Sequence, residues 1–408
     1  MKGRGGRRGS LGIFLAEFLT SVMLAAGLFL LIPERVQAAE TPSSDYESER
    51  NDTGETQGVD TSLVEDLDFS EVQQTVDEIL EGDFQFKSTV LDLITGKQPF
   101  TLESFLETLI HQAGNNWETE KRILLSILVL GIAASLFSNF TMIFQSQQIA
   151  EVSFEITYML LFLILLQVFS GAMELADSAI TSLRQFMNAL LPAYCLSVTM
   201  AAGATTAIVF YQFLLGLIYV LEWLIQEGLL GLIHVHVILV FINHLTKEEY
   251  LSQMAELLEK AAGWVLKSIL AVVIGFNTIQ GILSPVIDSL KNTAFSRVAQ
   301  MIPGIGNIAG SVTDVLLGSA ILIKNGVGAA ALIVMILLCM APLLKLGILV
   351  VILKLAAALI QPVSDKRMTG CVAGVGDGIK LLFRAVFTVA VLFVITIVVV
   401  TVSVRSIV

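Results

Sequence analysis

Long runs of uncharged, apolar residues dominate the chain from Ile123 to its end. Each run is about 17 residues or longer, and a helix of roughly 20 residues crosses the ~30 Å of hydrocarbon in a bilayer. Only 15% of the residues are charged, against about 25% in an ordinary soluble domain. The sequence therefore predicts an all-α, polytopic helical membrane protein. A soluble fold with buried core helices would need a polar shell, which this part of the chain does not supply.

The apolar runs predict about seven to nine transmembrane helices. The candidate spans are residues 123–144, 156–173, 187–221, 228–245, 264–287, 326–343, 346–362 and 385–404. The third run is long and contains Pro192 and Gly203, so it is either one kinked helix or a tight hairpin. Residues 298–323 are apolar apart from Asp314 and fit a re-entrant pair at membrane depth. Residues 246–263 have helical amphipathic spacing and predict a helix lying at the membrane surface.

The first 38 residues predict a signal peptide. A basic start, Lys2 to Arg8, precedes an apolar stretch from Leu11 to Ile32. Val36 and Ala38 then supply the small residues that signal peptidase requires for cleavage after Ala38. Because the apolar stretch is long for a signal peptide, an uncleaved anchor helix is the alternative. In both cases the following residues are exported.

The negative charge of the chain is concentrated in the exported segment. The net charge is −12, yet residues 40–120 alone hold 20 Asp and Glu against Arg50, Lys87 and Lys97. Residues 39–62 are polar and acidic and predict a disordered linker. Helical periodicity returns afterwards, so residues 63–122 predict an extracytoplasmic domain of amphipathic helices, ahead of a transmembrane domain at 123–408. A core this small is marginal alone, so we expect it to pack on the membrane part or on a partner. This acidic balance argues against nucleic-acid binding.

No catalytic, nucleotide-binding or metal-binding motif occurs in the sequence. There is no Walker motif, no HExxH and no nucleophile elbow. Cys195, Cys339 and Cys371 are isolated, which argues for buried thiols rather than a disulfide framework. His234 and His236 point to nearly opposite sides of a helix and do not form a metal pair. We therefore expect no enzyme activity, no cofactor and no metal.

Four charged residues stand within or beside apolar runs: Asp314, Lys324, Lys345 and Lys354. Charges at membrane depth are costly and usually face the protein interior or water. Lys345, near a span end, is expected to reach the membrane interface. Lys354, mid-run, either does the same or faces a polar cavity or pairs with Asp314. A secondary transporter could bind substrate or protons at such residues; an intramembrane enzyme would need a paired catalytic motif.

Three stretches carry patterns that can be compared with a known family. Their characteristic residues are Pro303, Gly306, Asp314, Lys324, Asn325 and Gly328 in the first stretch, Lys354, Gln361 and Pro362 in the second, and Phe100, Phe105 and Leu106 in the extracytoplasmic third. With the predicted layout of signal peptide, ectodomain and many spans, they resemble the stage III sporulation protein AE family of endospore-forming bacteria. The resemblance covers roughly residues 63–405.

This resemblance implies a function that hydropathy cannot give. It implies a membrane subunit of a channel or secretion-like complex that joins mother cell and forespore and supports forespore development. Its partners would be other membrane proteins of the stage III sporulation complex, including a separate ATPase. Its location would be the cell membrane, and in sporulating cells the mother-cell-derived membrane around the forespore. The family has no established catalytic residues. Phe100, Phe105 and Leu106 become docking candidates, and a secondary transporter remains the alternative function.

The first testable prediction concerns orientation. Lys366, Arg367, Lys380 and Arg384 lie between the last two predicted spans, and the positive-inside rule places residues 363–384 in the cytoplasm. In intact cells, an impermeant thiol reagent should modify a cysteine placed at Ser70 and spare one at Ser364, with the parent chain as the control for native thiols. Equal labelling at both positions would reject this orientation.

Overall fold

The computed structural model describes the helical part of the chain and leaves its first 63 residues out. The described residues are 64, 67–80, 84–95, 121–122, 125–129, 132–133, 147–202, 204–245, 250–299, 306–362 and 364–403. Within them every secondary-structure element is a helix, and they contain no strand. The all-α prediction is therefore confirmed. The predicted signal peptide, the linker and the docking residues Phe100, Phe105 and Leu106 lie outside the described residues.

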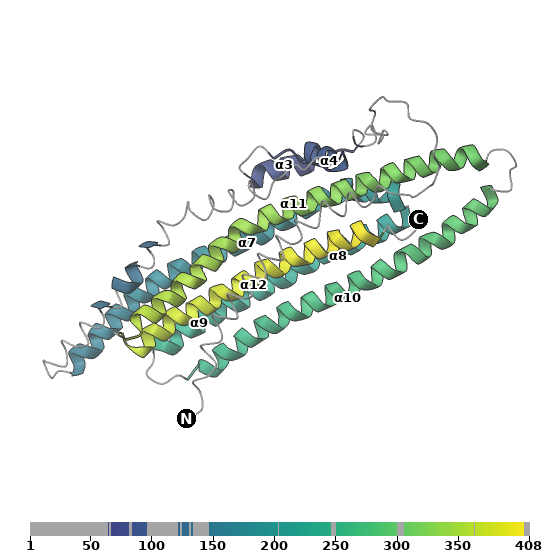
Figure 1. Cartoon of the computed structure of the whole chain (residues 1–408). Coiled ribbons are helices and arrows are strands. Elements are labelled where there is room, and N and C mark those ends of the chain that lie inside the picture. The colour runs from purple at the N-terminus through teal and green to yellow at the C-terminus, as the bar shows by residue number, and fades with distance from the viewer. Residues whose placement is uncertain are drawn as a thin grey trace.

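Very long helices form one elongated bundle (Figure 1). The elements are α3 (Ser70–Ile79), α4 (Phe86–Ile94), α7 (Gln147–Ala202), α8 (Ala204–Leu221), the π-helix η1 (Glu222–Leu229), α9 (Leu230–Leu245), α10 (Ser252–Ala299), α11 (Gly306–Ile360) and α12 (Lys366–Ser403). α7 and α11 have 56 and 55 residues. At about 1.5 Å per residue each is roughly 80 Å long, more than twice the thickness of bilayer hydrocarbon.

Four helical stretches among the described residues are long and apolar enough to cross a membrane. They are Phe154–Ala201, Ile208–Leu245, Gly318–Ile360 and Lys366–Thr401. The predicted total of seven to nine crossings stays a prediction.

Two predicted boundaries within α11 are wrong. The break in hydropathy at residues 344–345 predicts two spans, 326–343 and 346–362, but Gly306–Ile360 is one continuous helix that also contains Pro342. Neither a lysine nor a proline within an apolar helix necessarily ends it, because neighbouring helices supply the missing contacts. The described part of the predicted re-entrant pair, residues 306–323, is the first part of this same helix.

The long 187–221 run folds as a hairpin, one of its two predicted alternatives. The rings of Tyr194 and Phe210 lie 5.7 Å apart, and those of Phe169 and His234 lie 5.9 Å apart. The earlier residue of α7, Phe169, contacts the later residue of the second arm, His234. The two arms are therefore antiparallel. The arm after α8 continues through η1 into α9 without a break.

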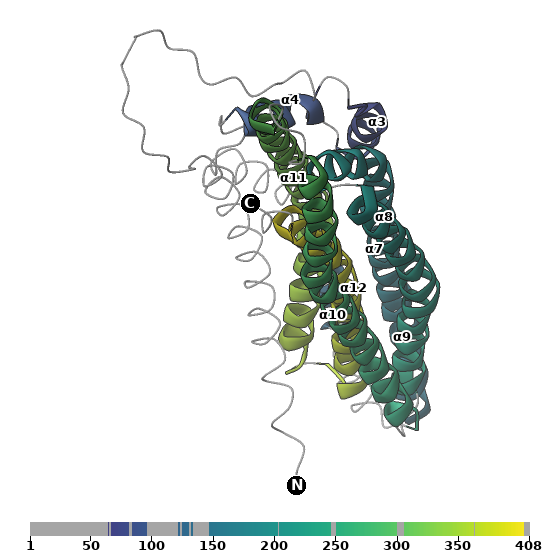
Figure 2. The same ribbon diagram turned by 90° about the vertical axis from the view of Figure 1, so that its right-hand side faces the viewer.

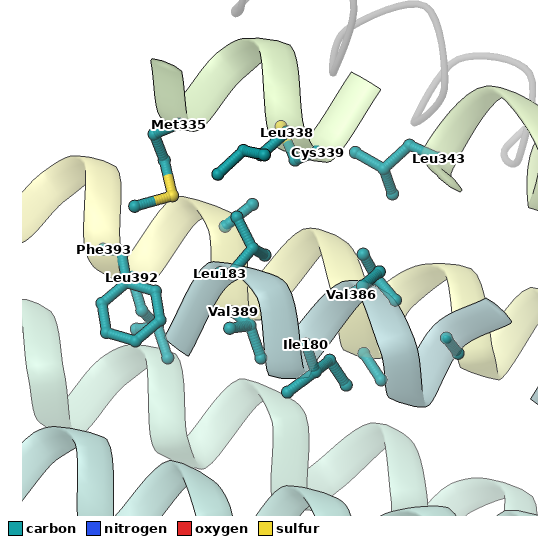
Figure 3. Close-up of a cluster of buried hydrophobic side chains, with 14 of the residues drawn as sticks. Ile180, Leu183, Met335, Leu338, Cys339, Leu343, Val386, Val389, Leu392 and Phe393 are labelled. Carbon is teal, nitrogen blue, oxygen red and sulfur yellow. The ribbon is translucent and has the colours of Figure 1, made fainter. Parts of the chain in front are cut away.

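α12 is enclosed by α7, α9, α10 and α11. Its side chains interlock with those of α7 and α11 in the apolar core shown in Figure 3. The labelled core residues are Ile180, Leu183, Met335, Leu338, Cys339, Leu343, Val386, Val389, Leu392 and Phe393. α12 begins at Lys366, so the residues predicted to form a cytoplasmic loop at 363–384 are mostly helix, and only a short turn joins α11 to α12.

Three glycines at every fourth position of α12 let α9 approach closely. A Cβ atom added at Gly370, Gly374 or Gly378 would overlap His244, Val240 or Val237, respectively. Small residues at this spacing are a common means of packing membrane helices backbone to backbone. The four-residue spacing of these glycines is visible in the sequence, but it predicts helix packing only if residues 363–384 form a helix and not the predicted loop.

α10 packs antiparallel to α9 and α8. The Nδ1 atom of His236 lies 2.8 Å from the Ala255 carbonyl oxygen, and the rings of Phe213 and Phe276 stack at 4.3 Å. The amphipathic segment predicted to lie at the membrane surface is, from Ser252 onwards, the start of α10. Ala255 and Ala262 are buried, so one side of this segment packs on the bundle, whereas Met254 and Leu257 are exposed. Its place at the membrane surface stays a prediction.

The two short helices α3 and α4 lie along the outside of the bundle (Figures 1 and 2), α3 against α7 and α4 against α11. Gln73 joins them: its Nε2 donates to the Phe84 carbonyl at 2.7 Å, and its Oε1 accepts from the Phe86 N–H at 2.8 Å. Just before α3, Asp68 accepts hydrogen bonds from the hydroxyl and the backbone N–H of Ser70, which lower the pKa of that carboxyl. Packing of this small unit on the bundle agrees with its marginal core.

A second prediction tests the glycine packing. Gly374→Leu should lower the free energy of unfolding by about 1–3 kcal/mol or more, because overpacking forces the helices apart. The midpoint of thermal unfolding in detergent would measure it. Gly216→Leu is the matched control, since a Cβ there meets no atom within 4 Å. Similar losses in the two variants would show that the close approach of α9 and α12 does not matter.

Candidate functional site

Lys324 is fully buried inside the bundle, on α11. Its ammonium donates to the carbonyl oxygens of Thr401 at 2.7 Å and Val400 at 3.5 Å. These carbonyls belong to the last turn of α12, where helix geometry leaves C=O groups without intrahelical partners and the helix dipole is negative. Lys324 therefore caps the end of α12 from a neighbouring helix. This accounts for a lysine in an apolar segment.

A tyrosine joins the same end of α12 to α7. The hydroxyl of Tyr194 lies 2.7 Å from Thr401 Oγ1 and donates to the Ile397 carbonyl at 3.3 Å. Gly328 makes room for this contact, because a Cβ there would overlap the Thr401 side chain and lie 3.3 Å from the Tyr194 hydroxyl. The glycine predicted from the family pattern thus has a packing role.

α4 docks about half a turn away, on another face of α11. A Cβ at Gly326 would lie 2.6 Å from Ile94 Cγ1 and 3.5 Å from the Val90 carbonyl oxygen. Beside it, Asn325 has a buried Oδ1 atom with no hydrogen-bond partner among the described residues. Residues 324–328, called here the α11 junction, therefore connect α11 to α12, α7 and α4.

A second polar contact lies near the other end of α11. Lys354 Nζ is 2.7 Å from Asp377 Oδ1 on α12 and donates to the Ala373 carbonyl at 3.0 Å. The Lys354 and Asp377 side chains are 17% and 33% exposed. Gly376 leaves room for the lysine stem, since a Cβ there would lie 3.5 Å from Lys354 Cε. Asp377 was missed in the sequence because its segment was assigned to a loop.

A direct pair between Asp314 and either lysine is excluded within one chain. Asp314, Lys324 and Lys354 all lie on the single helix α11. Lys324 is ten residues after Asp314 and Lys354 is forty residues after it. At about 1.5 Å per residue, these separations are roughly 15 Å and 60 Å along the helix. The structure describes the backbone of Asp314 but not its side chain. One of the interpretations of Lys354, a pair with Asp314, is therefore wrong within one chain, because both residues lie on α11.

The remaining predicted residues fall at the helix ends or outside the described part. Gly306 is the first residue of α11, and Gln361 and Pro362 form the turn after it. The Gln361 N–H donates to the Ala357 carbonyl at 3.1 Å, and a proline at this place is a common helix stop. Pro303 lies outside the described residues.

These polar groups form a structural framework. The α11 junction and the Lys354–Asp377 pair hold α11 and α12 together at two points about 45 Å apart along the helix. Within the described residues, no three His, Cys, Asp or Glu side chains gather as a metal site would require. The arrangement sets helix positions and docks α4 on the bundle.

The comparisons with known proteins decide the family. The family model described as "Stage III sporulation protein AE" matches residues 84–404. The chain belongs to this family. It is 26% identical over 308 residues to the stage III sporulation protein AE of Bacillus subtilis (strain 168), an alignment that covers 75% of this chain and 77% of that protein. No solved structure matches. The resemblance found in the sequence is confirmed, and the matched region contains both polar contacts.

A third prediction tests the Lys354–Asp377 pair. Exposed ion pairs contribute about 0–1 kcal/mol, whereas removing one partner of a buried pair costs about 3–5 kcal/mol. Asp377→Leu should therefore lower the unfolding free energy by an amount between these limits. The double variant Lys354→Leu with Asp377→Leu should recover part of the loss, because no unpaired charge remains.

The matched control for this pair is Lys260→Leu, which breaks an exposed contact with Glu256 and should change stability little. Thermal unfolding in detergent measures all of these variants. Strict additivity of the two single losses at Lys354 and Asp377 would show that the pair is not coupled.

Proposed function

We propose that this family member is a membrane subunit of the channel or secretion-like complex connecting mother cell and forespore, and that forespore development requires it. Membership of a stage III sporulation family supports the process. Four helices able to cross a membrane support a multi-pass subunit, here assigned to the mother-cell-derived membrane around the forespore. A separate ATPase would supply energy, because the sequence has no nucleotide-binding motif.

The observation that carries the proposal is the α11 junction. A segment that resembles the family pattern coincides with the place where α4 is fixed to the bundle at Gly326. This anchoring sets where the chain leaves α4 for residues 96–120, which contain Phe100, Phe105 and Leu106. We infer that other membrane proteins of the complex bind this following segment. The bundle would serve as a rigid base that presents it.

The alternative of a secondary transporter loses its main support. Lys324 donates to two carbonyl groups and Lys354 pairs with Asp377. Both lysines hold helices together in the structure, whereas a transporter would need them available for substrate or protons.

A fourth prediction tests the proposed role of the junction. In a sporulating strain that lacks its own copy of the gene, Gly326→Leu should insert at normal levels but displace α4. Spore yield should then fall by roughly tenfold or more, as expected when an added side chain disrupts a close contact. Co-purification of the other stage III membrane proteins should fall with it.

Two further variants separate the steps in this experiment. Gly216→Leu, at an open position on α8, should sporulate normally. Phe105→Asp with Leu106→Asp should lose the partner proteins while leaving α4 docked. Normal spore yield from Gly326→Leu at normal protein levels would contradict the role of the junction.

A further inference from the structure

One exposed face of α7 changes character along its length. It is apolar at both ends, where Leu163 and Leu196 are 59% and 54% exposed. Between them the exposed residues, with the exception of Pro192, are polar or small: Gln167, Ser170, Gly171, Glu174, Asp177, Ser178, Gln185 and Asn188. At about 1.5 Å per residue this strip is roughly 30 Å long. Because α7 is a candidate membrane-crossing helix and carboxylates facing hydrocarbon are costly, the strip must meet water or protein.

The π-helix η1 lies beside the strip and extends it. Gln226 Nε2 lies 3.1 Å from Asp177 Oδ1 and 2.8 Å from Thr181 Oγ1. Glu227, the next residue, is exposed. π-helical turns are rare and often mark functional sites. The carboxylates of Glu174, Asp177 and Glu227 therefore belong to one surface built from two helices.

This surface also has open positions where another helix could approach. An added Cβ at Gly171 or Gly231 would meet no atom within 4 Å, whereas the spaces at Gly374 and Gly378 are filled by valines of α9. Small residues beside polar ones are typical of contacts between membrane helices. Gly171, Glu174, Asp177, Glu227 and Gly231 are called here the α7–η1 face.

The complementary features stand on α10, the outer helix packed on α9 and α12 (Figure 1). Trp264 is 76% exposed, and Lys260 and Lys267 are exposed one turn on either side of it. Lys260 pairs with Glu256 at 2.7 Å and also lies near exposed Glu259, whereas Lys267 forms no ion pair with another described side chain. Lys260, Trp264 and Lys267 are called here the α10 face.

The two faces lie at the same height along the bundle. The His236–Ala255 contact fixes α10 against α9. Trp264 is nine residues after Ala255 on α10, and Glu227 is nine residues before His236 on the opposing arm. Because the two arms are antiparallel, Trp264 and Glu227 lie at the same level. The hydrogen bond from Gln226 to Asp177 then fixes η1 against α7. Trp264, Glu227 and Asp177 therefore share one level, although they lie on different helices.

Equal height matters because membrane-embedded copies share one orientation. Such copies are related by rotation about an axis perpendicular to the membrane, and this rotation does not shift one copy along the axis. Two different faces of a chain can then meet only if their heights agree, and repeated contacts of this kind close into rings.

We propose that the chain forms a head-to-tail oligomer in the membrane, in which the α10 face of one copy packs against the α7–η1 face of the next. Trp264 packs at the level of Asp177 and Glu227, and the open positions Gly231 and Gly171 lie one to two helical turns from it. Lys267, with Lys260, meets the carboxylates of Glu174, Asp177 and Glu227. This removes the polar strip from lipid. The arrangement is independent of the proposed role in sporulation.

The test uses two charge-reversal variants that each destroy one face. The first is Glu174→Lys with Asp177→Lys, and the second is Lys260→Glu with Lys267→Glu. Full-length chains carrying two different tags are co-expressed and purified from membranes through one tag. Wild-type copies should co-purify, and each variant should lose self-association by roughly tenfold or more.

The decisive sample mixes the two variants. The first retains an intact α10 face and the second an intact α7–η1 face, and their two reversed faces are again opposite in charge, so the pair should co-purify. This pairing also shows that both variants are folded. The control Glu71→Lys with Glu78→Lys, on the exposed side of α3, carries the same charge change and should associate like wild type.

Three results would overturn the proposal. They are wild-type copies that do not co-purify, a variant that self-associates as well as wild type, and a mixture that fails to pair although both variants insert at wild-type levels. The last result would also be expected if the strip lines water instead of a second copy.

Discussion

The bundle depends on satisfying the backbone at the end of α12 inside an apolar environment. The last carbonyl groups of a helix have no partner in the helix itself, and leaving them without a hydrogen bond away from water is costly. Lys324 supplies its ammonium to two of them. The burial of a lysine and the burial of a helix end, each unfavourable alone, thus compensate each other. This contact fixes the register of α11 against α12, and Gly328 and Tyr194 bring α7 to the same point.

The same compensation recurs elsewhere in the bundle. Lys354 meets Asp377 and a backbone carbonyl, and Gln226 lies within hydrogen-bond distance of both Asp177 and Thr181. Each of these contacts joins two helices, as polar groups in membranes usually do. The α7–η1 face is different because its carboxylates are exposed and its glycines are open. Among the described surfaces, it therefore has the most to gain from a second chain.

Much of the fold class was predictable from the sequence, since long uncharged runs permit little besides membrane helices. The residues of the α11 junction were predictable from their resemblance to a family pattern, but their roles were not. Lys324 contacts residues far away in the sequence, so only the fold could identify the end of α12 as its partner. Asp377 and Gly374 escaped notice because nearby basic residues indicated a loop. Helix boundaries failed for a related reason: hydropathy breaks at Lys345, whereas the backbone hydrogen bonds of α11 continue through it.

The position of α4 limits where the membrane can lie. Lys87 and Ser88 on its outer side are exposed and would be costly in hydrocarbon, so a membrane around the bundle is expected to leave α4 outside its hydrocarbon. From Gly326 to Ile360 the helix extends about 50 Å, enough for one crossing with its headgroup regions but not for two. This part of α11 is therefore long enough for a single crossing, and the turn before α12 lies at the end of α11 away from α4. This turn is followed by Lys366 and Arg367, the charges that the positive-inside rule assigns to the cytoplasm. Helix packing separates α4 from these basic residues along α11, as the predicted orientation requires, and the orientation itself stays a prediction.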